Sequence, residues 1–72
     1  MNKEKVKKLV SDVIEQSKDE DGNVNDVKVW QRINQLENSL FYNEMIDFQT
    51  QEEKEFSNVL NQAIKILRNL FY

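Results

Sequence analysis

The last third of the sequence, residues 50–72, has the pattern of one strongly amphipathic helix with a wide apolar face. Its charged residues fall elsewhere, and its apolar residues recur at helical spacing: Phe56, Val59, Leu60, Ala63, Ile64, Ile66, Leu67, Leu70 and Phe71. At 100° per residue this face covers about 160°, whereas a helix that packs on one neighbour needs little more than about 100°. We therefore expect this helix to contact two neighbours, both from its own chain or one from a second chain.

The length of the chain and its missing residue types limit how it can be stabilised. Seventy-two residues make one domain, 1–72, whose core usually contributes only about 3–5 kcal/mol of net stability. The sequence has no cysteine and no histidine, which excludes disulfides and thiolate metal sites and removes the usual general base. Self-association is the remaining aid, so we expect a homodimer.

The charge and hydropathy of the chain indicate a cytoplasmic protein. Its net charge of −3 neither marks a nucleic-acid binder nor reaches that of a DNA mimic. Its apolar runs are too short to cross a membrane or to form a signal peptide, so we expect no membrane contact. Abundant asparagine, glutamine and lysine are typical of AT-rich coding sequence, as in a low-GC bacterium, its phage or another mobile element.

Two further amphipathic segments precede the last one, because a single glycine and no proline leave few helix breakers. Residues 3–17 form the first, with Asn2 as N-cap and with Val6, Leu9, Val10, Val13 and Ile14 on one face. It ends before Gly22 and Asn23, which can adopt a left-handed backbone.

The second segment, residues 26–45, begins at a capping residue, Asn25 or Asp26. Val29, Ile33, Leu36 and Leu40 form its central apolar stripe, with Trp30 and Phe41 on one flank.

The boundary between the second and third segments admits two interpretations. Thr50 and Glu53 match a capping box, Asp47 offers another cap, and the apolar stripes on either side point in opposite directions. These features predict a break and an all-α fold, a small three-helix bundle with helices at 3–17, 26–45 and 50–71. Against the break, Phe41, Met45 and Phe48 share an azimuth with the third stripe. The alternative is a helical hairpin with one long second helix, which would have to dimerise.

Oxygen-bearing residues alternate in the acidic loop 19–25, as in a calcium site. An EF-hand needs glycine at its sixth position and glutamate at its twelfth, where this sequence has Val24 and Trp30. We interpret the loop as a solvated turn and predict no metal and no cofactor.

Lys3, Lys5, Lys7 and Lys8 cluster at the start of the first helix and could bind phosphate or an acidic partner. The third helix opens with Glu52, Glu53 and Glu55, which would repel DNA phosphates from a recognition helix. A nucleic-acid-binding accessory protein, in which a dimer combines two lysine clusters, is therefore only an alternative.

A second apolar stripe with acidic edges includes the flank of the middle segment that carries Trp30 and Phe41, and we predict that it faces a partner. It consists of Trp30, Glu37, Phe41, Glu44, Met45 and Phe48. Phe71 and Tyr72 end the chain; we expect them to cap the bundle near Trp30, with a partner-binding tail as the alternative.

The function that these patterns favour is non-enzymatic protein–protein binding. The serines have no histidine to activate them, and one glycine cannot form a phosphate-binding loop, so we predict no catalytic residues and no small-molecule substrate. We expect a small regulator, inhibitor or assembly factor that docks through a helix face. The structural subunit of a larger assembly is a further alternative.

Overall fold

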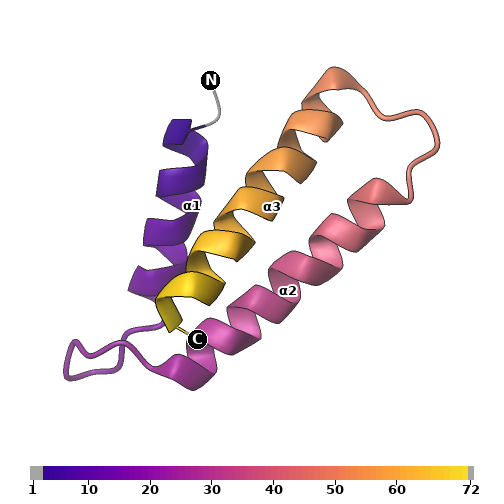
Figure 1. The fold of residues 1–72 in the computed structure, drawn as a ribbon. Helices are drawn as coiled ribbons and strands as arrows, with labels where there is room; N and C mark the ends of the chain where they lie inside the picture. Colours follow the sequence, from indigo (N-terminus) through magenta and orange to yellow (C-terminus); the bar gives the residue numbers. More distant parts are fainter. Residues whose placement is uncertain (1–2, 72) are drawn as a thin grey trace.

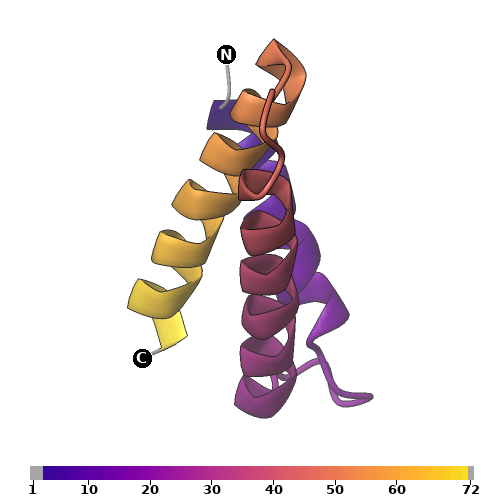
Figure 2. The same ribbon diagram turned by 90° about the vertical axis from the view of Figure 1, so that its right-hand side faces the viewer.

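A computed structural model of the chain describes residues 3–71 and contains three α-helices over that range (Figure 1). They are α1 (Lys3–Gln16), α2 (Asp26–Glu44) and α3 (Gln51–Phe71). α1 and α3 run in the same direction and α2 runs in the opposite direction, as Figures 1 and 2 both show. The predicted three-helix bundle is confirmed, and each observed helix boundary lies within one residue of its predicted position. The alternative of one long second helix is wrong.

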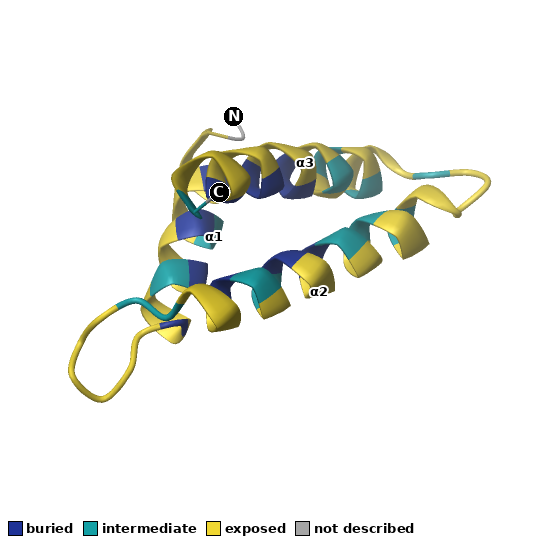
Figure 3. Ribbon diagram, turned by 60° about the horizontal axis from the view of Figure 1, so that its bottom comes forward, coloured by how far each residue is buried: buried dark blue, intermediate teal, exposed yellow. Residues whose placement is uncertain are grey.

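The core is built around α3, which contacts both other helices, while α1 and α2 contact each other less. This confirms that the wide apolar face needs two neighbours and shows that both come from the same chain. Figure 3 shows the buried parts of α2 and α3 facing each other across the bundle. The buried apolar residues are Val6, Val10, Val13, Val29, Ile33, Leu36, Val59, Leu60, Ala63, Ile64 and Leu67.

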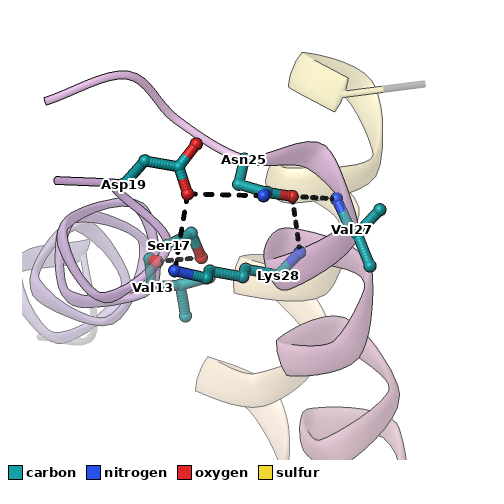
Figure 4. Close-up of polar contacts among 6 residues, drawn as sticks. All are labelled: Val13, Ser17, Asp19, Asn25, Val27 and Lys28. Carbon is teal, nitrogen blue, oxygen red and sulfur yellow. Dashed lines mark hydrogen bonds and ion pairs between the residues drawn. The ribbon is translucent and has the colours of Figure 1, made fainter. Parts of the chain in front are cut away.

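Polar contacts fix the turn between α1 and α2 (Figure 4). The buried Ser17 hydroxyl donates to the Val13 carbonyl at 2.6 Å. The backbone amide of Asn25 donates to the Ser17 carbonyl at 2.8 Å. The Asn25 side chain accepts from the Val27 amide at 2.9 Å, which confirms Asn25 as the N-cap of α2. Gly22 has φ 83°, the left-handed conformation that glycine adopts without strain.

Two predictions concern residues next to the ends of α1. Asn23 does not adopt a left-handed conformation, because Gly22 already reverses the chain and is the residue with positive φ among residues 3–71. Asn2, the predicted N-cap of α1, lies outside the described residues.

The break between α2 and α3 is produced by reciprocal side-chain capping. The Thr50 amide donates to Glu53 Oε1 at 3.0 Å, and the Glu53 amide donates to Thr50 Oγ1 at 3.2 Å. This is the predicted capping box. Asn43 secures the same loop, because its Nδ2 donates to the Glu53 carbonyl at 2.8 Å and to Ser57 Oγ at 2.5 Å.

The packing predicts that substitutions of two α3 leucines differ strongly in their effect on stability. Leu67 is fully buried and Leu70 is 60% exposed. Leu67→Ala should lower the free energy of unfolding by about 2–5 kcal/mol, which is comparable with the whole stability of so small a domain. Leu70→Ala is the matched control and should change it by less than about 0.5 kcal/mol. Urea denaturation followed by circular dichroism measures both, and equal losses would contradict this packing.

Candidate protein-binding surfaces

Large apolar side chains are exposed where α2 ends and the chain turns towards α3. They form the 41–48 patch, defined as Phe41, Tyr42, Met45, Ile46 and Phe48. Their exposed fractions run from 41% for Ile46 to 93% for Phe48. Five such side chains within eight residues are far more than the scattered apolar residues of an ordinary surface. The patch spans the last turn of α2 and the α2–α3 loop, which is at the upper right of Figure 1.

Helix geometry explains why these residues are not buried. Met45 follows Leu36 by nine residues, so it points to the side of α2 opposite the buried Leu36. Phe41 and Tyr42 pack against each other edge to face, with ring centroids 5.9 Å apart. They cover each other only in part and leave most of both rings exposed.

Hydrogen bonds hold the loop that carries the patch. Gln49 Nε2 donates to the Asn43 carbonyl at 2.6 Å, while the Asn43 side chain reaches the first turns of α3. The residues between Asn43 and Gln49 are therefore closed into a short loop anchored at both ends. Such a loop loses less conformational entropy on binding than an untethered one.

The segment that carries the patch has charged side chains of one sign. Residues 33–53 contain no lysine or arginine, and their acidic residues are Glu37, Glu44, Asp47, Glu52 and Glu53. Glu44 and Asp47 are exposed and lie within the patch segment itself. A partner would therefore meet an apolar surface with a negative edge.

The structure divides the predicted partner-binding residues into two groups. Phe41, Glu44, Met45 and Phe48 are exposed near the α2–α3 loop, whereas Trp30 and Phe71 are partly buried and pack against the core. Trp30 precedes Phe41 by eleven residues, about 16 Å along the helix, so the two belong to different parts of the surface. Tyr72 lies outside the described residues.

Tyr42 and Ile46 were missed from the sequence. Tyr42 lies one position beyond the stripe through Phe41, and Ile46 follows the end of the helix. Tyr42 and Ile46 are four residues apart, but no apolar residue continues this pair towards the start of the helix, so the pair was not recognised as a stripe. Two exposed large apolar residues next to Phe41 and Met45 were the available signal.

Glu37, the remaining predicted residue, pairs across the bundle with Arg68 of α3. An Arg68 Nη atom donates to Glu37 Oε1, and both side chains are about half exposed. The two residues lie 31 positions apart, so no local pattern could show the contact. The pair links α2 to α3 and removes Glu37 from the acidic edge available to a partner.

A groove of about 540 Å³ lies between α1 and α3. Leu9, Phe56 and Val59 provide its apolar surface. Lys5 and Lys8 line it from α1, and Glu52 and Glu55 line it from α3. Two of the four lysines in the predicted basic cluster, Lys5 and Lys8, therefore share a groove with carboxylates of the same molecule, an arrangement that sequence spacing alone could not show.

The acidic loop between α1 and α2 uses its leading carboxylate within the fold. Asp19 accepts a hydrogen bond from Asn25 Nδ2 at 3.4 Å and forms an ion pair with Lys28 at 3.5 Å (Figure 4). Across residues 3–71, three or more acidic side chains are nowhere grouped so as to hold a metal ion. The helices of this range are also too short or too polar to cross a membrane.

The Glu37–Arg68 pair should contribute little to stability, because both groups are half exposed. A double-mutant cycle with Glu37→Gln and Arg68→Gln should give a coupling free energy of at most about 1 kcal/mol. The coupling should shrink as salt is raised, since exposed charges are screened. Chemical denaturation of the four proteins measures it. A larger, salt-insensitive coupling would mean that the pair is shielded from water.

Comparisons with known proteins identify no relative from which a function could be inferred. No family model matches the chain, and no curated protein and no solved structure is significantly similar to it.

Proposed function

We propose that this chain is a non-enzymatic protein-binding module that docks through its 41–48 patch. The observation that supports this most directly is the exposure of five large apolar side chains, two on the last turn of α2 and three on the tethered loop that follows it. Exposing them to water costs the free protein, and burying them on a partner would recover that free energy. Aromatic and methionine side chains are also the residue types enriched at the centres of protein interfaces.

The size of the patch favours a reversible complex. Burying a fully exposed large apolar side chain gains about 1.5–3 kcal/mol. The five side chains are 41–93% exposed, so burying all of them would gain about 5–10 kcal/mol. Association costs about 4–15 kcal/mol in lost translational and rotational freedom. Because the gain and the cost are similar, the patch suits a partner that binds and leaves. A regulator, inhibitor or assembly factor works in this way, whereas a permanent subunit usually has a larger interface.

The acidic edge determines the chemistry of the partner. Glu44 and Asp47 would repel an acidic surface and attract a basic one, which speeds the encounter and fixes its orientation. We therefore assign to the partner an apolar face bordered by lysine or arginine. We place this interaction in the cytoplasm, and the composition fits a phage or another mobile element of a low-GC bacterium.

The position of the lysines weighs against the alternative of nucleic-acid binding. Lys5 and Lys8 line a groove whose other wall carries Glu52 and Glu55, so phosphates there would meet both signs of charge. We expect no mobility shift of DNA or RNA even at about 50 mM salt, where backbone-driven binding is strong. A shift that weakens steeply as salt rises would favour the alternative instead.

A displayed random-peptide library tests the proposed surface without requiring the identity of the partner. Selection on the wild-type protein should enrich peptides that combine apolar anchors with lysine or arginine. Phe41→Ser/Phe48→Ser should weaken binding of the selected peptides by about tenfold or more, because it removes two exposed rings at the centre of the patch. Isothermal titration measures the affinities.

Val27→Ser is the matched control, since Val27 is also an exposed apolar residue of α2 but lies far from the patch. It should leave peptide binding unchanged, and both variants should keep the helicity of the wild type. Peptides that are acidic, or that bind the double variant as tightly as the wild type, would rule out the proposed surface.

A further inference from the structure

We propose that the groove between α1 and α3 binds a second copy of this chain, with α1 of each copy packed on α3 of the other. The two copies would be related by a two-fold axis parallel to the groove. This groove has no lining residue in common with the five side chains of the 41–48 patch. Dimerisation through the groove does not depend on the function proposed for the patch.

The apolar floor of the groove is the first observation. Phe56 is 49% exposed and Leu9 is partly buried beside the buried Val59. α3 therefore satisfies its two neighbours within the chain and still leaves an aromatic ring half uncovered. A third contact for α3, from outside the molecule, would cover this ring.

The charges on the two walls are the second observation. Lys5 and Lys8 lie on the α1 wall, and Glu52 and Glu55 lie on the α3 wall. None of these four side chains forms an ion pair with another residue of the range 3–71. Lysines near a helix N-terminus are also disfavoured by the helix dipole. Carboxylates supplied from outside the molecule would offset that cost.

The third observation is that the lining residues of the two walls have the same spacing along their helices. On α1 the groove is lined by Lys5, Lys8, Leu9 and Asp12, and on α3 by Glu52, Glu55, Phe56 and Val59. Both walls therefore follow the same i, i+3, i+4, i+7 pattern, which marks one face of a helix. Because α1 and α3 run in the same direction (Figures 1 and 2), their matching positions occur in the same order along the groove.

This matched spacing favours one symmetry axis for the dimer. A two-fold rotation about an axis parallel to the groove places the α1 wall of one copy on the α3 wall of the other and keeps the residues in the same order along the groove. Lys5 then meets Glu52 of the other copy, and Lys8 meets Glu55. A two-fold axis across the groove would instead place the lysine wall on the lysine wall. Only the parallel axis pairs opposite charges while Leu9 and Phe56 remain in contact between them.

The size of the chain favours a second copy as the occupant. A stable interface covers about 800 Å² on each partner, roughly a seventh of the 5542 Å² accessible surface of this protein. So small a domain gains from oligomerisation because its own core is limited. The matched charges also make the face complementary to itself, a requirement of a two-fold interface that an unrelated partner need not meet.

Charge reversal tests the proposal by sedimentation equilibrium. The wild type should dimerise. Lys5→Glu/Lys8→Glu makes both walls acidic and Glu52→Lys/Glu55→Lys makes both basic, so each variant alone should dimerise at least about tenfold more weakly. An equimolar mixture of the two variants should recover dimers, because each acidic wall then faces a basic one. Circular dichroism checks that both variants remain helical.

Two further variants locate the interface. Phe56→Ala should weaken dimerisation, and Phe41→Ser/Phe48→Ser should leave it unchanged. A wild type that is monomeric at about 1 mM, or a dimer that neither charge reversal affects, would overturn the proposal. Weaker dimerisation in the patch variant would place self-association on the patch. Peptide binding to the 41–48 patch is measured separately, so failure of one proposal does not decide the other.

Discussion

The packing of α3 against two helices at once is the interaction on which the rest of the structure depends. Leu60, Ala63 and Leu67 occupy the centre of its wide apolar face and are almost completely buried. α1 and α2 contact each other less, so each is held mainly by α3. Because both neighbours come from the same chain, the bundle closes on itself. The exposed residues of the 41–48 patch therefore lie outside this shared core.

Most of the fold could be predicted from the sequence because its signals are local. The spacing of Val6, Val10 and Val13 predicts the face of α1, and the Thr50–Glu53 box marks the start of α3. Helical period and capping chemistry operate within one or two turns. A chain with a single glycine and no proline leaves few competing interpretations of them.

The candidate surfaces were predictable only in part, because they depend on which helices meet. Phe41, Met45 and Phe48 share an azimuth and were found from spacing, whereas Tyr42 and Ile46 form only an isolated i, i+4 pair. The ion pair of Glu37 and the carboxylates opposite the lysines of α1 join residues distant in the sequence. Sequence spacing defines the faces of single helices, whereas the relative rotation of two helices is set by packing.

The hydrogen bonds around Asn43 make the α2–α3 loop independent of contacts with α1. They join the end of α2 to the first turns of α3 and involve no residue of α1. The shape of the loop carrying Phe48 is thus determined by the α2–α3 pair alone. Fraying at the free end of the first helix would leave these hydrogen bonds in place. The exposure of the aromatic rings and the closure of the core by α1 therefore depend on different contacts.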